Sequence, residues 1–190
     1  DIKWKPSKFP DGQQQVTIIG LSSENPCVGI VFNSVQIKAR LNNWTDLELI
    51  NCAVASLRGL DVKEIHLYVP YILGARSDRK FGEGENNYLK DVICPAINLL
   101  NLDSVTCIDP HSNCLEMGIK NFRKIDNSNL VDWVLTEISG NNLVVPDWAK
   151  RFVIVSPDAG ATHKIYKLAE KLHYTEEIIT CRKERDGEGK

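Results

Sequence analysis

Two apolar runs, each followed directly by a polar and charged segment, constrain the fold of this chain more than any other feature. The first run covers residues 65–69 and leads into residues 70–80. The second covers residues 105–108 and leads into residues 109–112. Both runs have the length and composition of buried strands. Because ligands bind outside the carboxyl ends of the strands in open α/β sheets, we expect both charged segments at a ligand-binding edge.

The rest of the chain alternates between strand-like and helix-like patterns, which predicts an α/β fold with a mainly parallel sheet flanked by helices. Further strands are expected at residues 16–19, 27–32, 152–155 and 177–181, and helices at residues 45–59, 88–100, 129–138 and 165–172. We expect Thr45 and Glu48 to form the capping box of the first helix. Pro95 should kink or restart the second helix. Residues 33–43 are interpreted as a connection, and residues 82–87 as a flexible polar loop.

A turn-rich break at residues 140–147 is the best candidate for a domain boundary, because Gly140, Asn141 and Asn142 end a helix and Pro146 prolongs the break. We therefore expect one domain over residues 1–148 and the beginning of a second over residues 149–190. The length of 190 residues is enough for a sizeable core without covalent staples.

Composition excludes several classes of partner. The formal net charge of −2 argues against a large nucleic-acid surface. The six cysteines contain no Cys-x-x-Cys pair, which is typical of reduced thiols in a cytoplasmic protein. Because no apolar run approaches the ~18 residues of a membrane span and the amino end has no signal-peptide pattern, we expect no membrane partner.

The two charged segments after the apolar runs carry groups suited to a polyphosphate and a divalent cation. Arg76, Arg79 and Lys80 form a dense cationic cluster, and the planar guanidinium group matches phosphate oxygens. Asp109 and His111 could hold Mg²⁺, which takes one or two carboxylates and keeps several waters. The alternatives are a solvated charged loop at the first segment and a turn-forming aspartate beside an exposed histidine at the second.

Two further segments carry weaker signals. Residues 156–160, Ser-Pro-Asp-Ala-Gly, are interpreted as the turn between a strand and a helix, which would place Asp158 near the amino terminus of that helix. An aspartate there either caps the helix or works at an anion site. Lys183 and Arg185 lie in a charged, glycine-bearing tail that has the composition of a mobile loop or of a plain solvated charge run.

Taken in order, these segments resemble the motifs of one enzyme family. Its Phe-x-Asp-Gly-Glu segment corresponds to residues 9–13, its Pro-Tyr-x-x-x-Ala-Arg-Gln-Asp-Arg motif to residues 70–79, and its Asp-x-His segment to residues 109–111. Its Ser-Pro-Asp-Ala-Gly turn is intact at residues 156–160, and the Lys-x-Arg of its flexible loop matches residues 183–185. The chain thus resembles the ribose-phosphate diphosphokinases, also called phosphoribosyl pyrophosphate synthetases, from about residue 9 to the end.

The resemblance implies two phosphoribosyltransferase-like α/β halves, the first over residues 1–148 and the second beginning at residue 149. Members of the family are homo-oligomers, usually hexamers, with the adenine between neighbouring subunits. They transfer the β,γ-diphosphoryl group of Mg²⁺-ATP to O1 of ribose 5-phosphate, and AMP leaves. The resemblance therefore implies ATP and ribose 5-phosphate as partners, Mg²⁺ as the metal and self-association of this chain.

The resemblance also implies a role for each matching residue. The adenine would be approached from a neighbouring subunit by Phe9, Asp11 and Gln13. The rest of ATP would be held by Arg76, Ser77, Asp78 and Arg79. The metal and the phosphates would be organised by Asp109, His111 and Asp126. Asp158 would orient the ribose hydroxyls, and catalysis would fall to His111, Lys183 and Arg185, the last two closing over the transferred group.

Departures from the family pattern leave alternatives open. Gln13 and Ser77 replace the family's glutamate and glutamine, and the first strand and helix of the family are absent or shortened. The family's later loop for the 5-phosphate of ribose has no counterpart, so we expect that the 190-residue chain alone does not turn over. The alternatives are a non-catalytic regulatory homologue that assembles with active subunits, and a related diphosphokinase acting on a larger, nucleotide-linked ribose phosphate.

Overall fold

The computed structural model describes residues 2–19, 32–139 and 152–182, and it contains two compact units, Asp1–Ile125 and Asp126–Lys190. The predicted domain boundary between residues 148 and 149 lies outside the described residues and stays a prediction. None of the described helices is long and apolar enough to cross a membrane.

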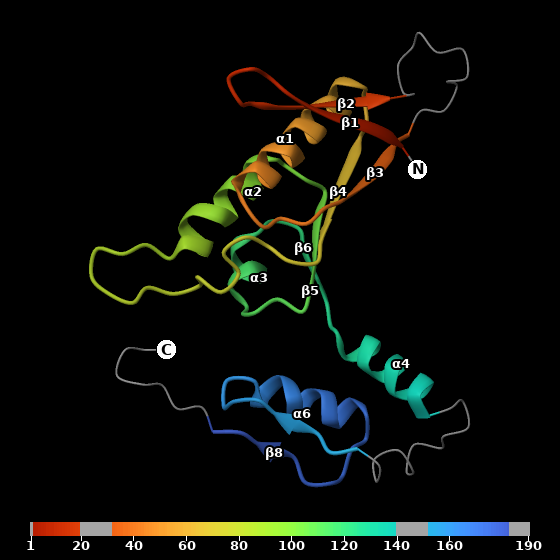
Figure 1. Cartoon of the computed structure of the whole chain (residues 1–190), viewed down its shortest axis with the longest axis vertical. Coiled ribbons are helices and arrows are strands. Elements are labelled where there is room, and N and C mark those ends of the chain that lie inside the picture. The colour runs from red at the N-terminus through yellow and green to blue at the C-terminus, as the bar shows by residue number, and fades with distance from the viewer. Residues whose placement is uncertain (1, 20–31, 140–151, 183–190) are drawn as a thin grey trace. The chain divides into compact units, whose positions relative to one another are not determined.

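A four-stranded parallel sheet forms the centre of the first unit, as the alternating pattern predicts (Figure 1). Its strands lie in the order β3 (Ser34–Lys38), β4 (Glu64–Val69), β5 (Ser104–Ile108) and β6 (Phe122–Ile125). The register pairs Val69 with Cys107 and Ile108 with Ile125. Neighbouring strands therefore end at a common edge, and the segments that follow β4 and β5 emerge side by side.

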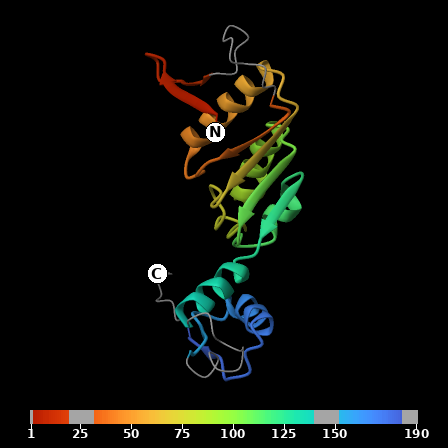
Figure 2. The ribbon, with the colours of Figure 1, turned by 90° about the vertical axis from the view of Figure 1, so that its right-hand side faces the viewer.

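The two faces of this sheet differ in character. Ile65, Leu67 and Val69 alternate along β4 on the buried face. The helices α1 (Trp44–Gly59), α2 (Cys94–Leu99) and α3 (Cys114–Gly118) all lie on one side of the sheet (Figures 1 and 2). On the opposite face, the side chains of Gln36 and Arg123 are exposed. The apolar core is thus built between one face of the sheet and the three helices.

Two strands of this sheet were not expected from the sequence. β3 lies inside residues 33–43, which we interpreted as a connection, and that interpretation is wrong. Residues 34–38 alternate polar and apolar side chains, the pattern of a half-buried strand, and β3 is an edge strand of the sheet. β6 follows a turn at Asn121 and, within the part of the chain that the structure describes, pairs with β5 alone. The predicted strand at residues 27–32 lies outside the described residues except for its last position.

The amino-terminal cap of α1 is Asn43, two residues before the predicted cap. The side chain of Asn43 accepts a hydrogen bond from the backbone N–H of Asp46 at 3.0 Å, and the Asp46 carboxylate accepts from the N–H of Asn43 at 3.2 Å. The predicted capping box of Thr45 and Glu48 is therefore wrong. Asparagine is as strong a cap as threonine or stronger, and the Glu48 carboxylate instead accepts from the N–H of Gln14 at 3.0 Å.

The predicted helix over residues 88–100 is confirmed, together with its break at Pro95. It begins as a π-helix, η1 (Tyr88–Ile93), and restarts as α2 with Pro95 in the first turn. Proline is tolerated there because the first turn of a helix has no intrahelical acceptor for its N–H groups.

An antiparallel hairpin, β1 (Lys3–Lys8) and β2 (Gln14–Ile19), packs on α1 through β2. The Ser56 hydroxyl donates to the carbonyl of Val16 at 2.8 Å, and the thiol of Cys52 donates to the carbonyl of Gln14 at 3.3 Å. All six residues of β1 are exposed. Its lysines and Pro6 are of the types that protect edge strands from pairing with other chains.

The second unit has a smaller core. Its elements among the described residues are α4 (Ser128–Ser139), β7 (Val155–Ser156), α6 (Thr162–Lys171) and β8 (Ile179–Thr180). The predicted helix at 129–138 and the helix face at residues 165–172 are confirmed, with Ala169 and Leu172 buried. The strands predicted at residues 152–155 and 177–181 are shorter, two residues each, and pair in parallel.

Candidate functional site

The segment after β4, which we call the arginine loop (residues 70–87), is shaped by tight turns. The backbone N–H of Ala75 donates to the carbonyl of Ile72 at 3.1 Å, and that of Ser77 donates to Gly74 at 2.8 Å. Gly74 has a φ of +74°, and a Cβ at this position would lie 2.8 Å from a ring carbon of Tyr88. Only glycine fits both the backbone conformation and the close approach of the Tyr88 ring.

The second half of the arginine loop is closed by side-chain hydrogen bonds. The amide group of Asn87 donates to the carbonyl of Asp78 at 2.6 Å, and its carbonyl oxygen accepts from the N–H of Lys90 at 2.9 Å. The Glu85 carboxylate accepts from the N–H groups of Phe81 and Gly82 at 2.8 and 3.1 Å. Residues 82–87 thus make several side-chain hydrogen bonds, and the prediction that this segment is flexible stays a prediction.

Three cations of this loop have no anionic partner within the described part of the chain. Arg76, Arg79 and Lys80 are exposed, and none of the three makes a hydrogen bond or an ion pair with the described residues. Arg79 makes one contact, with its guanidinium carbon 5.2 Å from the centroid of the Phe81 ring. Three unpaired cations in one ordered loop form a site at which an anionic ligand is electrostatically favoured.

The segment after β5, which we call the aspartate–histidine loop (residues 109–113), begins with a strained residue. Asp109 has a φ of +40°, in the left-handed region that few residues other than glycine occupy. Its backbone N–H donates to the carbonyl of Ile125 at 2.8 Å, which holds it at the end of the sheet. The Asp109 side chain is half-buried and that of His111 is exposed. Asn101 and Asn121, which lie in turns outside the two charged loops, also have a positive φ, so the value at Asp109 describes a tight turn and does not by itself mark a site.

Two thiols on either side of the aspartate–histidine loop, in β5 and α3, lie near the arginine loop. Cys107, the fourth residue of β5, donates its thiol to the carbonyl of Pro70 at 3.7 Å. Burial raises the pKa of the Cys107 thiol to about 11, with a smaller contribution from Asp109. Burial also raises the pKa of the Cys114 thiol, and the negative charge of Asp78 raises it further. Asp78 therefore lies within electrostatic range of the helix that follows the aspartate–histidine loop.

The donor set at these loops fits a magnesium ion that arrives with a phosphate ligand. Within residues 2–19, 32–139 and 152–182, no three His, Cys, Asp or Glu side chains gather as a metal cage. Mg²⁺ typically takes one or two carboxylates, several waters and the substrate's phosphates. Asp109 supplies a carboxylate and His111 a neighbouring imidazole, so the ion's remaining ligands would come from water and phosphate.

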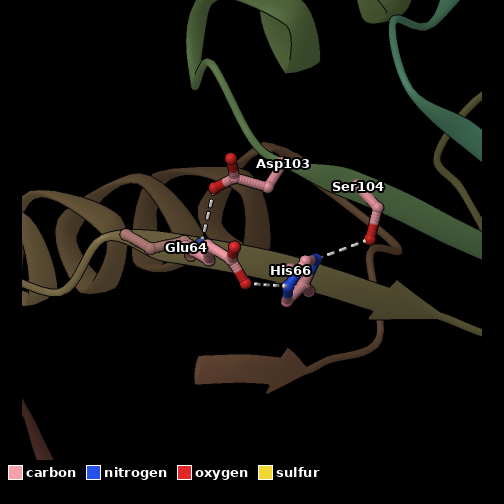
Figure 3. A network of polar contacts seen from close by, with 5 residues as sticks. Glu64, His66, Asp103 and Ser104 are labelled. Atoms are coloured by element: carbon pink, nitrogen blue, oxygen red, sulfur yellow. Dashed lines mark hydrogen bonds and ion pairs between the residues drawn. The ribbon is translucent and has the colours of Figure 1, made fainter. Parts of the chain in front are cut away.

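The histidine of β4 has a structural role. Nδ1 of His66 lies 2.8 Å from the hydroxyl oxygen of Ser104, and its Nε2 lies 3.7 Å from the Glu64 carboxylate (Figure 3). The Asp103 carboxylate accepts from the backbone N–H of Ile65 at 2.7 Å. Glu64 and Ser104 are the first residues of their strands, so this network lies at the amino ends, opposite the two charged loops.

The hairpin residues Phe9, Asp11 and Gln13 are not brought together with the arginine loop. All three lie exposed at the turn between β1 and β2, and the side-chain amide of Gln13 faces the Asp11 carboxylate. The hairpin lies at the other end of the first unit from the carboxyl ends of β4 and β5 (Figures 1 and 2). Their predicted contact with a nucleotide held by a neighbouring subunit stays a proposal.

Two predicted site residues belong to the second unit and make local contacts. Asp126 accepts from the backbone N–H of Ser128 at 2.8 Å, at the start of α4. Asp158 accepts from the N–H of Ala161 at 2.9 Å, just before α6. Both aspartates therefore shape the turns that lead into helices. Their predicted ligand roles are not tested by these contacts, and Lys183 and Arg185 lie outside the described residues.

Sequence reasoning missed the residues that hold the arginine loop in place, namely Glu85 and Asn87. A signal for Asn87 was present, because an asparagine directly before a helical run is a preferred cap. Glu85 left no such signal, since its carboxylate bonds to N–H groups of a loop whose backbone conformation has no periodic pattern.

No protein-family model and no curated protein sequence matches this chain. Among solved structures, phosphoribosylpyrophosphate synthetase from Mycobacterium smegmatis matches with a TM-score of 0.75 over 97% of this chain, at 16% sequence identity. This chain shares its fold with that enzyme. It spans 57% of the enzyme's length. The match confirms the predicted α/β fold.

Proposed function

We propose that this protein binds Mg²⁺-ATP at the carboxyl ends of β4 and β5 and serves in the transfer of a diphosphoryl group to a ribose phosphate. One observation carries the proposal. The arginine loop and the aspartate–histidine loop, which hold two family motifs, follow neighbouring parallel strands and leave three cations and an exposed histidine without partners among the described residues. The fold shared with a phosphoribosylpyrophosphate synthetase supports the same proposal.

In this proposal Arg76 and Arg79 bind phosphate oxygens of ATP, because guanidinium groups match them in charge and geometry. Asp109 and His111 hold Mg²⁺ together with water and phosphate. The ion would neutralise charge on the β- and γ-phosphates. Phosphoryl transfer depends mainly on positioning and on neutralising spread charge, so an ordered cationic loop is suited to it.

In the proposed reaction O1 of ribose 5-phosphate attacks the β-phosphorus of ATP. The bond between that phosphorus and the oxygen bridging to the α-phosphorus breaks, the O1 hydroxyl loses its proton, and AMP leaves. Asp158 is proposed to orient the ribose hydroxyls, and Lys183 and Arg185 to cover the transferred group. Self-association, with Phe9 reaching a neighbouring subunit's nucleotide, is part of the same proposal.

The test is a product analysis of the protein at the full length that its cell makes. The protein is incubated with Mg²⁺-ATP and ribose 5-phosphate and followed by ³¹P NMR. The proposal predicts AMP and a C1 diphosphate ester of ribose in equal amounts. ADP with a phosphate monoester, or AMP with free diphosphate, would contradict the diphosphoryl transfer. Nucleotide binding without either product would identify a regulatory homologue, and product formed only from a nucleotide-linked ribose would identify the larger acceptor.

A further inference from the structure

Phe81, the more exposed of two aromatic residues on the surface of the arginine loop, has no role in the function proposed above. The side chain of Phe81 is 74% exposed, although exposing a phenyl ring to water is unfavourable. Its backbone is fixed by the Glu85 carboxylate, which accepts from the N–H groups of Phe81 and Gly82. The loop therefore presents this ring in a defined place, with the guanidinium of Arg79 above it at 5.2 Å.

The contact with the ring leaves the hydrogen-bonding edge of Arg79 available. A guanidinium that stacks on an aromatic face is attracted by the ring's electrons, while its five N–H donors point outward in its own plane. The loop's Glu85, which could have paired with Arg79, is bonded to backbone N–H groups instead. Arg79 makes no hydrogen bond or ion pair with any described residue. The ring thus restrains this cation without using any of its donors.

We propose that Phe81 is a positioning residue that holds the Arg79 guanidinium ready for the polyphosphate chain of the nucleotide. This inference rests on the proposed nucleotide site. It assigns Phe81 to the phosphates and not to the base, although an exposed ring could also stack on a base. The two assignments differ in which ligands respond to a change at residue 81.

The experiment measures the binding of Mg²⁺-ATP and of inorganic tripolyphosphate to the 190-residue chain by calorimetry. Phe81→Leu should weaken both ligands by roughly twofold to fivefold, the scale of one exposed cation–π contact. Phe81→Tyr, which keeps an aromatic ring at this position, should leave both affinities at the values of the unchanged chain. In an Arg79→Ala background, Phe81→Leu should have no further effect, because the two residues act as one unit.

A readout that needs no ligand accompanies the titrations. The ring current of Phe81 should shift the Arg79 Nε–H resonance, and Phe81→Leu should remove this shift while Phe81→Tyr keeps it. If Phe81→Leu weakens ATP but not tripolyphosphate, the ring stacks on the base and the inference is overturned. If Arg79→Ala weakens both ligands and Phe81→Leu weakens neither, the inference fails while the proposed site stands. If the wild-type chain binds neither ligand, the proposed site fails and the inference with it.

Discussion

Replacing Gly118, the last residue of α3, with alanine should destabilise the first unit through one steric contact. A Cβ at this position would lie 2.7 Å from the sulfur of Cys94 and 3.1 Å from its Cβ. Ordinary contacts of this kind lie near 3.5–4.0 Å, so the two groups must separate by about 1 Å. Cys94 is 1% exposed and cannot move outward.

The surroundings prevent α3 from relieving the clash cheaply. The side chain of Asn98 donates to the carbonyl of Gly118 at 2.8 Å and accepts from the N–H of Lys120 at 2.9 Å, which ties α3 to α2. Adding a methyl group to a packed site typically costs 1–3 kcal/mol. We therefore expect Gly118→Ala to lower the free energy of unfolding by about 1–3 kcal/mol. Because α3 directly follows the aspartate–histidine loop, ATP affinity should also fall.

The assay is urea unfolding of the 190-residue chain, with Gly59→Ala as the matched control. Gly59 is also the last residue of a helix, and a Cβ there would meet nothing within 4 Å, so this change should be neutral or slightly stabilising. In a Cys94→Ala background, which removes the sulfur, the cost of Gly118→Ala should fall below about 1 kcal/mol. An equal cost in both backgrounds, or a stabilised Gly118→Ala, would refute the steric reasoning.

Three further outcomes follow from burial, titration and the proposed reaction. Leu67→Ala, at a fully buried position of β4, should cost about 2–5 kcal/mol of unfolding free energy in urea; a cost below 1 kcal/mol would show that the sheet is not packed as described. Burial raises the pKa of the Cys107 thiol from 9.0 to about 11, so the folded chain keeps a proton that the unfolded chain loses, and stability should decline from pH 9 to pH 11. Cys107→Ala should make this decline shallower, and an unchanged slope would contradict the assignment. Arg185→Ala should lower turnover in the ³¹P NMR assay by about 10²–10³-fold with ATP affinity unchanged, and lost affinity with unchanged turnover would contradict a role in the transition state.

Sequence patterns predicted the buried elements of the first unit better than its edges. β4 and β5 lie between other strands and carry buried apolar side chains on their inner face, and both were identified. β3 is an edge strand with alternating polarity and β6 is only four residues long, so neither gives a strong local signal. The cap of α1 was misplaced because Asn43–Asp46 and Thr45–Glu48 both fit the capping pattern. The contact of Glu48 with the hairpin, which separates these two possibilities, is long-range.

The sequence predicted which residues make up the candidate site, but not the turns and hydrogen bonds that hold its two loops in place. The cations and the Asp-x-His segment could be placed at one sheet edge because parallel strands end together. The positive φ of Asp109 and the bonds of Glu85 and Asn87 depend on the turn geometry of the folded loops, which has no periodicity in the sequence.

The central claim, that ATP binds between the carboxyl ends of β4 and β5, is tested most directly by calorimetric titration of Mg²⁺-ATP into the 190-residue chain and three variants. Arg76→Ala and His111→Ala each remove one side chain of the two loops. Lys63→Ala removes an exposed cation that directly precedes β4, at the amino end of the sheet, and serves as the control. A charged hydrogen bond contributes about 1.5–3 kcal/mol, so we predict that Arg76→Ala weakens binding at least about tenfold. His111→Ala should also weaken binding, and Lys63→Ala should leave it unchanged. Equal affinity of all four proteins for Mg²⁺-ATP would contradict the placement of the site.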